Sequence, residues 1–307
     1  MTADRRHSND SAARRTRWSW YAYDLGNTAV EFAIPLYLTT WIVSDLGISA
    51  VVFGLASAAS SWAIGLSGPY IGVNADEKGR RKLWFMWSAL VAAVLLGSVG
   101  LLPHGSAAGI IVILVIAMLA NYFFQLSSLI YNASMLSAAR GANVVSVSSL
   151  GMGLSYLGGV IGVGVIELFI SGRVIPGVTG RGYALLPAAL FFLACAVPSM
   201  FTRRLWQQSA VRETSPRGTL HQRMRALWAE SAREYRAGWF LAGYFALNSA
   251  VMGLTLYLPL HVQAVTGVEG FALLAVFGVV VLSSAVGAGV VAVMRPQGAM
   301  VRRIILV

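Results

Sequence analysis

The sequence predicts an all-α polytopic membrane protein. Of its 307 residues, 57% are apolar and only 11% are charged, whereas about 25% of the residues of a soluble domain are charged. Glycine is abundant, with 32 residues, and small residues favour close packing of helices in a membrane. The net charge of +11 does not indicate a nucleic-acid partner, because the basic residues lie between apolar segments and form no single patch.

Eight apolar stretches are long enough to cross a bilayer, which requires roughly 20 residues per helix. They lie near residues 20–43, 50–73, 83–102, 109–137, 144–170, 183–202, 238–260 and 270–294. All 23 Lys and Arg residues fall outside these stretches.

The distribution of basic residues predicts an orientation. With the N-terminus in the cytoplasm, all the Lys and Arg residues except Arg173 and Arg181 lie on the cytoplasmic side. The positive-inside rule therefore predicts a multi-pass protein of the cytoplasmic membrane with a cytoplasmic N-terminus. Residues 1–19 then form a cytoplasmic basic tail, and no cleavable signal peptide is evident because the apolar stretch that follows is too long.

The spans fall into two groups on either side of a long connection. Residues 20–202 form an N-terminal half of six helices, residues 203–237 form a cytoplasmic linker, and residues 238–307 hold two helices and the start of a third. Two such groups joined by a basic linker are typical of a two-halved transporter. Apolar residues recur at helical spacing in the linker, at Leu220, Met224, Leu227, Trp228 and Tyr235. They predict either an amphipathic helix on the inner membrane face or a solvated linker helix.

The loop after the second span carries the most specific motif. Residues 72–82 read Gly-Val-Asn-Ala-Asp-Glu-Lys-Gly-Arg-Arg-Lys. This loop resembles the signature loop of the major facilitator superfamily, Gly-x-Leu-Ala-Asp-x-x-Gly-Arg-Arg/Lys, and lies where that family has it. The matching residues are Gly72, Asp76, Gly79, Arg80 and Arg81. The other reading of this loop is an ordinary basic turn that obeys the positive-inside rule.

The loop residues also have a physical role that does not depend on the resemblance. Gly72 and Gly79 would allow close approach and a tight turn, and Asp76 could accept hydrogen bonds from a helix N-terminus or from Arg80 or Arg81. We expect Asp76 and Arg80 to latch a cytoplasmic gate, as alternating access requires.

Three further segments resemble one branch of the superfamily, the autophagy-related vacuolar amino-acid effluxers. Residues 20–29 read Trp-Tyr-Ala-Tyr-Asp-Leu-Gly-Asn-Thr-Ala, near the branch pattern Tyr-Asp-Trp-Ala-Asn-Ser-Ala. Residues 131–136 and the Gly-rich residues 149–159 resemble its fourth span and its entry to the fifth. The resemblance implies a major-facilitator-type helical bundle, and a permease that moves or effluxes an amino acid or related metabolite.

The superfamily has twelve spans in two halves, whereas this sequence ends just after an eighth. Residues 295–303 stand where the second half would repeat the signature loop, and residues 304–307 would begin a ninth helix. We expect a bundle truncated to about eight transmembrane helices, which is either a fragment or a chain that assembles with a second chain. We prefer the first explanation.

Polar residues inside the predicted spans are the candidates for function. Asp24 and Glu31 lie on one face of the first span, ~10 Å apart along its axis, and Asn27 shares that face. A charge at the bilayer centre costs roughly 2.5–3.5 kcal/mol on insertion scales. No Lys or Arg lies within a span to pair with these acids, so we expect them to be protonated or to face water. A proton-coupling role is favoured for Glu31, and an acid at the cytoplasmic helix end is the alternative for Asp24.

The fourth span carries a face of amides and one hydroxyl. Its members are Asn121, Gln125, Ser128 and Asn132. With Asn27 and Glu31, they would line a polar path for solute and protons, or they form interhelical hydrogen bonds. Glu167 lies near the outer end of the fifth span, where its head can reach water.

No residues support an enzyme, a cofactor or a metal site. The four His residues are far apart, and there is one Cys, Cys195; no nucleophile elbow or phosphate-binding loop is present. The predicted partners are a small-molecule solute, protons and the lipid bilayer. The alternatives are a non-transporting membrane scaffold or receptor and an inactive truncated fragment of a transporter.

Overall fold

The computed structural model describes residues 2–207, 235–268 and 270–294, together with the single positions 221, 222, 225 and 229. The described residues are mostly helical, and one isolated β-bridge among them joins Ser171 to Thr179. The all-α class predicted from composition is therefore confirmed.

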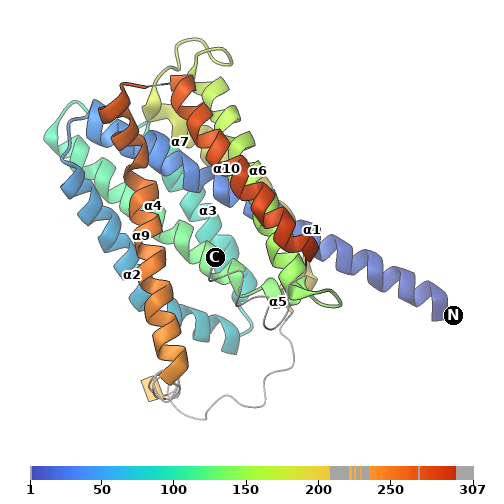
Figure 1. Cartoon of the computed structure of the whole chain (residues 1–307). Helices are drawn as coiled ribbons and strands as arrows, with labels where there is room; N and C mark the ends of the chain where they lie inside the picture. Colours follow the sequence, from blue (N-terminus) through green and yellow to red (C-terminus); the bar gives the residue numbers. More distant parts are fainter. Residues whose placement is uncertain are drawn as a thin grey trace.

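Within the described residues, eight long helices form the bundle (Figure 1). They are α1 (Thr2–Ala33), α2 (Ala50–Glu77), α3 (Arg81–Val99), α4 (Ala107–Asn132), α6 (Val144–Ile170), α7 (Leu185–Phe201), α9 (Tyr235–Thr266) and α10 (Gly270–Met294). All except α1 are long and apolar enough to cross a membrane. α1 differs because Asp24 and Glu31 interrupt its apolar part and its first turns lie in the basic tail.

Short elements connect these helices. They are the π-helical segments η1 (Ile34–Thr39) and η2 (Trp41–Asp45), the short helix α5 (Met135–Ala138), and the 3₁₀ turns η3 (Arg181–Ala184) and η4 (Arg203–Trp206). The π-helical segments continue α1, and the Thr39 hydroxyl donates to the carbonyl of Ile34, five residues earlier. Pro35 stands at the start of η1, where its missing N–H removes one bond of the α-helical ladder.

Three helix boundaries differ from the predicted spans. The helix that carries the first span already begins at Thr2, so it includes residues 2–19 of the predicted tail. The seventh span was predicted to end at residue 260, but α9 ends at Thr266. The fourth span was predicted to reach residue 137, but α4 ends at Asn132. The chain turns there because the Ser134 hydroxyl and backbone N–H both donate to the carbonyl of Tyr131, at 2.6 and 2.8 Å.

Most of the predicted linker 203–237 lies outside the described residues, and so does its predicted amphipathic helix. Residues 295–307, with the predicted start of a ninth helix, lie outside them as well.

Side-chain caps fix where three spans begin. The Ser49 hydroxyl accepts from the N–H of Val51 before α2, and the Ser106 hydroxyl accepts from Gly109 in α4. The Asn143 side chain accepts from the N–H of Ser146 in α6. Such caps satisfy backbone donors that have no partner within the helix.

Helix α1 lies at the centre of the first six spans and packs against α6 and α7. Glycines on α6 allow this contact, because a Cβ on Gly158 would lie 2.5 Å from the Cα of Leu25. A Cβ on Gly162 would lie 2.3 Å from the Cβ of Ala29. These two glycines therefore allow close packing of α6 against α1.

Helices α9 and α10 meet the first six spans at different places. α10 runs along α6 (Figure 1), and the Ser146 hydroxyl donates to the carbonyl of Ala292 at 3.3 Å. α9 contacts η1, and the Tyr257 hydroxyl donates to the carbonyl of Ala50 at 3.0 Å. The described residues of α9 from 242 to 254 are exposed, so the second half of this helix makes its contacts.

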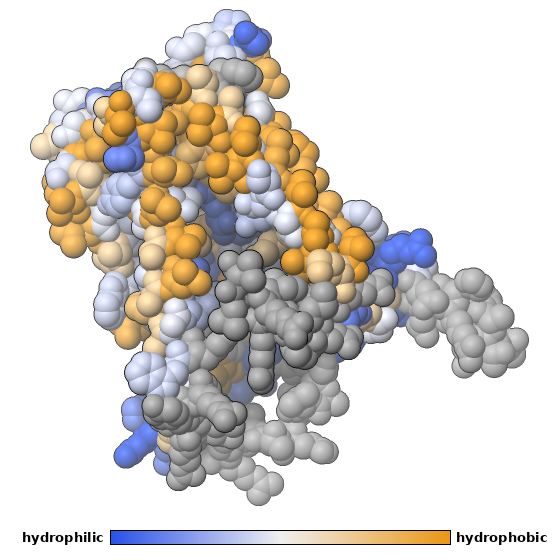
Figure 2. All heavy atoms as spheres, in the orientation of Figure 1, coloured by the Kyte–Doolittle hydropathy of each residue, from blue (hydrophilic) through white to orange (hydrophobic). Residues whose placement is uncertain are grey.

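For reference, the basic end is the end of the bundle with residues 76–82, 140 and 203–204. The opposite end holds the loops 46–49, 100–106 and 171–184. An ion pair of 2.9 Å between Arg181 and Asp45 joins two loops of the opposite end. Figure 2 shows that the sides of the bundle are largely hydrophobic, as expected for helices that contact lipid.

Candidate functional site

Five polar residues of α1 and α4 form a continuous hydrogen-bonded chain, here called the polar cluster. Its members are Tyr23, Asn27, Glu31, Ser127 and Ser128. The Asn27 amide nitrogen donates to Glu31 Oε1 at 2.8 Å, and the Ser128 hydroxyl donates to Asn27 Oδ1 at 2.6 Å. The Tyr23 hydroxyl lies 2.7 Å from the Ser127 hydroxyl and 3.4 Å from that of Ser128.

The cluster runs from a buried end to an accessible end. Tyr23 is fully buried among Phe85, Tyr131 and Phe192, and Asn27 is 6% exposed. Glu31 is exposed, although it lies within the predicted first span. Figure 2 shows hydrophilic surface in a hollow between α9 and α10. A carboxyl at the accessible end of a buried hydrogen-bonded chain can exchange protons with water.

Neither Asp24 nor Glu31 has a cationic partner among the described residues. The two ion pairs found there are Asp76–Arg81 and Asp45–Arg181. Asp24 is half-buried and has no hydrogen bond from a described residue. An acid within the membrane that lacks a cation is an expected feature of proton or solute pathways.

The polar face of α4 divides between two neighbouring helices. Ser128 bonds to Asn27 of α1, but Asn121 donates to Ser60 and Gln125 to Ser61, both on α2, at 3.1 and 3.3 Å. In this structure Gln125 therefore joins helices and does not contact Glu31. Asn132 is exposed at the end of α4, and its side chain makes no hydrogen bond with a described residue.

Tyr23 and Ser127 belong to the polar cluster but were not among the candidate residues predicted from the sequence. Tyr23 lies one turn before Asn27 on the same face of α1, so helical spacing could have found it. Ser127 could not have been found in this way, because it is adjacent to Ser128 and the two meet Tyr23 only through the packing of α1 on α4.

The loop between α2 and α3 forms a tight turn with an ion pair. The N–H of Arg80 bonds to the carbonyl of Ala75 at 2.8 Å, and that of Gly79 to Asp76 at 3.3 Å. Gly79 has a φ of +61°, which is the left-handed conformation that glycine adopts without strain. A Cβ on Gly72 would meet nothing within 4 Å, so close approach at this glycine was predicted wrongly for this structure.

Of the two arginines expected to donate to Asp76, Arg81 does so and Arg80 does not, so the expected latch between Asp76 and Arg80 is not formed in this structure. The Arg81 guanidinium donates to Asp76 Oδ1, and both side chains are partly exposed. Arg80 is exposed and forms no ion pair with a described residue. The turn explains the difference, because Arg80 follows Gly79 directly while Arg81 begins α3 and faces back to the end of α2.

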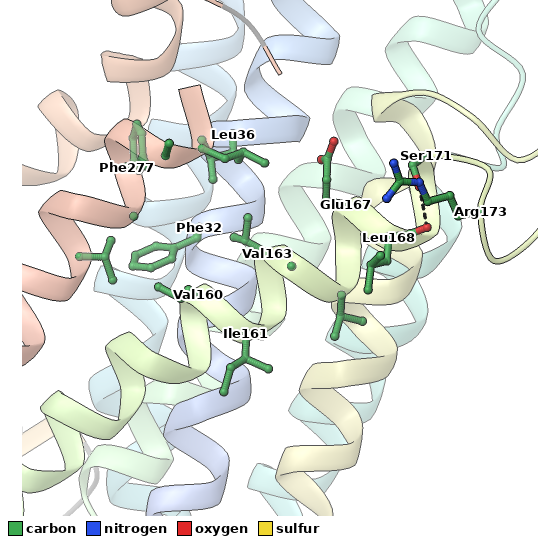
Figure 3. Close-up of a pocket in the computed structure, with 16 residues that line it drawn as sticks. Phe32, Leu36, Val160, Ile161, Val163, Glu167, Leu168, Ser171, Arg173 and Phe277 are labelled. Carbon is green, nitrogen blue, oxygen red and sulfur yellow. Dashed lines mark hydrogen bonds between the residues drawn. The ribbon is translucent and has the colours of Figure 1, made fainter. Parts of the chain in front are cut away.

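A cavity of about 860 Å³ lies where α1 and α6 meet α10, here called the seam cavity (Figure 3). Phe32, Val160 and Phe277 are among its apolar walls, while Glu167 and Arg173 lie together at one end (Figure 3). The Tyr37 hydroxyl donates to Glu167 Oε2 at 3.1 Å. Glu167 was expected simply to reach water, but it is half-buried and lines this cavity.

The described residues contain no group of three or more His, Cys, Asp or Glu side chains that could hold a metal ion. Comparison with known protein families gave one match: the family model described as Major Facilitator Superfamily matches residues 24–307. No curated protein and no solved structure matched the chain significantly.

Proposed function

The chain belongs to the major facilitator superfamily, and on this premise we propose that it is a permease that moves a small solute by proton-coupled alternating access. That it is a multi-pass membrane transporter of this superfamily follows from the match and from its apolar helices. The solute, the coupling to protons and the residues involved are our proposal.

The polar cluster carries this proposal. Glu31 is the accessible carboxyl at one end, and Asn27, Ser128, Tyr23 and Ser127 continue the hydrogen-bonded chain into the core. Loss of the proton from Glu31 would place a charge next to the Asn27 amide, which already donates to it. Protonation would therefore change the hydrogen bonding between α1 and α4, and such a change can bias a two-state transporter.

The solute would bind between the two groups of helices, near Glu31. Asp24, seven residues before Glu31, would supply a second acid on the same side of α1, and Asn27 would orient either the solute or the acid. Gln125 and Asn132 would join this path only in another conformational state, because here they lie apart from Glu31.

The loop between α2 and α3 would act as the gate at the basic end. Asp76 and Arg81 hold the end of α2 to the start of α3, and Gly79 makes the turn between them possible. Because both side chains are partly exposed, such a pair contributes roughly 0.2–1 kcal/mol. A contact of this strength can break and re-form during each transport cycle. Gly72 and Arg80 complete the gate motif without a comparable contact.

We place the basic end in the cytoplasm and the chain in the cytoplasmic membrane, in accord with the distribution of Lys and Arg. The resemblance of residues 20–29, 131–136 and 149–159 to amino-acid effluxers makes amino acids the first solutes to test.

The experiment is transport by the chain reconstituted in liposomes, with a panel of radiolabelled amino acids and an imposed pH gradient. We expect one or more amino acids to accumulate with the native chain. Glu31→Gln keeps an acceptor for Asn27 but cannot ionise, so accumulation should be lost, whereas Glu31→Asp should retain part of it. A Glu31→Gln protein that accumulates solute as well as the native chain would contradict the proton role. Absence of transport across the panel would favour the scaffold alternative.

A further inference from the structure

The basic end carries a second cavity, of about 530 Å³, between the N-terminal part of α1 and the end of α7. We call it the arginine cavity. Its walls are Ser11, Ala12, Arg15, Thr16, Phe201, Thr202, Arg203 and Arg204. Three arginines line this cavity and none of the lining residues is acidic.

The three arginines have no partner of opposite charge in the described part of the chain. Neither Arg15 nor Arg203 nor Arg204 forms an ion pair or a hydrogen bond with a described residue. All three side chains are exposed. Three like charges around one cavity repel one another, so an anion in the cavity would be stabilised by all of them.

The arginines are held in place by residues packed into the core. Leu205 and Trp206 follow Arg204 directly. Leu205 is 1% exposed, and the ring centroids of Trp206 and Phe85 lie 4.6 Å apart. The Trp206 indole also donates to the carbonyl of Ser199 at 2.8 Å. The turn η4 that carries Arg203 and Arg204 is thereby fixed to the end of α7.

The α1 side of the cavity is fixed to the same helix. The Ser199 hydroxyl donates to the carbonyl of Ser19, and the Ser19 hydroxyl donates to that of Thr16. Thr16, next to Arg15, is 4% exposed. The cavity is therefore preorganised by contacts between α1 and α7, which lowers the cost of ordering its arginines around a ligand.

The position of the cavity indicates what kind of anion fits it. It opens where the apolar helix α7 ends, and the last residue of that helix, Phe201, lines the cavity and is 73% exposed. Trp18, one turn after Arg15 on α1, is 57% exposed. Exposed aromatic side chains are typical of the membrane–water interface, where the lipid headgroups lie. Arginine binds phosphate with two parallel hydrogen bonds, and threonine hydroxyls can add to them.

From these observations we propose that the arginine cavity binds the phosphate-bearing headgroup of an anionic phospholipid in the leaflet at the basic end. Phe201 would contact the glycerol and the start of the acyl chains, while Arg15, Arg203 and Arg204 would surround the phosphate. A lipid bound there would hold the N-terminal part of α1 against α7. This would couple the start of the helix that carries Glu31 to the composition of the membrane.

The test is native mass spectrometry of the purified full chain, titrated with phosphatidylglycerol and separately with phosphatidylcholine. We expect saturable binding of phosphatidylglycerol that phosphatidylcholine does not reproduce. Arg15→Gln should weaken this binding about fivefold, the equivalent of ~1 kcal/mol for one basic residue at a membrane surface. The double variant Arg203→Gln, Arg204→Gln should weaken it further.

The neighbouring Arg14 provides the matched control. It is exposed on the same helix and carries the same charge, but it does not line the cavity. Arg14→Gln should leave phosphatidylglycerol binding within about twofold of the native value, because only general attraction is lost. Equal effects of Arg14→Gln and Arg15→Gln would overturn the proposal and indicate nonspecific attraction of a basic surface.

A second arm separates a lipid from a soluble anion. Inorganic phosphate at millimolar concentration should not displace phosphatidylglycerol, since it lacks the part that contacts Phe201. Displacement by inorganic phosphate would overturn the lipid assignment in favour of a soluble phosphate site. Phe201→Ser should weaken lipid binding as well, and an unchanged affinity in this variant would count against the assignment.

Discussion

Asn27 is the residue at which the two helices of the polar cluster meet. Its amide nitrogen donates to Glu31 and its amide oxygen accepts from Ser128, so both ends of the side chain are satisfied while it is nearly buried. An amide in this position can follow a change at Glu31 and transmit it to α4. The role that we propose for Glu31 in proton coupling therefore depends on Asn27 and Ser128.

Replacement of Ser128 by alanine tests this link. Ser128→Ala removes the 2.6 Å bond to Asn27 and leaves an acceptor in the core without its donor. A hydrogen bond of this kind contributes ~0.5–1.5 kcal/mol, so we expect proton-driven transport to slow about threefold to tenfold. Ser67→Ala is the control, because Ser67 bonds to Tyr122 at 2.8 Å outside the cluster. Equal transport rates for the two variants would show that the bond between Ser128 and Asn27 does not contribute to proton-driven transport.

Much of the cluster could be predicted at the residue scale. Asn27 and Glu31 on the first span and Ser128 on the fourth stand out in an apolar sequence because polar residues in a span are rare, and helical spacing puts Asn27 and Glu31 on one face. The partners of Gln125 could not be predicted, because they depend on how α2 packs against α4. The same holds for Tyr37 and Glu167, which are 130 residues apart in the chain.

At the scale of single elements, the contact between α1 and α6 depends on glycine. A Cβ on Gly158 would collide with the backbone of Leu25, whereas a Cβ on Gly164 would meet nothing within 4 Å. Both glycines lie in the same helix, so the pair offers a matched comparison of packing against helix propensity.

Gly158→Ala should lower the thermal unfolding temperature of the purified protein. Overpacking of this kind costs about 1–3 kcal/mol, which outweighs the roughly 0.5–1 kcal/mol that alanine gains over glycine in a helix. Gly164→Ala should leave the unfolding temperature unchanged or slightly raised. Circular dichroism in detergent would measure both, and an unfolding temperature for Gly158→Ala at or above that of the native protein would contradict the packing.

The gate at the end of α2 gives a second comparison between neighbours. Arg81 pairs with Asp76 and Arg80 does not, although sequence analysis had assigned the latch to Arg80. We therefore expect Arg81→Gln and Asp76→Asn to change the transport rate alike, by about fivefold or less given the modest strength of an exposed pair. Arg80→Gln should have a smaller effect. A larger effect of Arg80→Gln would mean that Arg80 becomes the partner in another state.

Some helix ends could be predicted from the sequence and others could not. The spans after α4 were predicted within three residues, because apolar length and turn residues bound them, except that α9 ends at Thr266 and not at residue 260. The start of α1 was missed because its first turns are polar and basic, and these residues carry no apolar period. The end of α4 was missed because Ser134 caps it through local hydrogen bonds that composition does not reveal.

At the scale of the molecule, α9 is bonded to the first six spans at the opposite end, whereas its described residues towards the basic end are exposed. Tyr257 of α9 bonds to Ala50 at the opposite end, whereas residues 242–254 of α9 are exposed. This arrangement fits a carrier whose path opens towards the basic end, within the part of the chain that the structure describes. Alternating access then requires the opposite end to open and the basic end to close.

Distance measurements between spin labels would follow this motion. Labels at Tyr70 on α2 and Ala242 on α9 report on the half of α9 that is exposed here. We expect the distance between them to shorten when transported solute is added. The same labels in Glu31→Gln should give a distribution that no longer changes with pH. A distance that is constant under all these conditions would argue against alternation of the two ends.

We propose that Glu31 couples the movement of solute to the movement of protons. A direct measurement of proton movement tests this coupling. Liposomes that contain the chain and an internal pH dye would be given an amino acid found to be transported, with the membrane potential clamped. We expect a solute-dependent pH change for the native chain and for Ser67→Ala. For Glu31→Gln we expect no such pH change, although this variant should still exchange labelled for unlabelled solute. A pH change of native size in Glu31→Gln would contradict the claim.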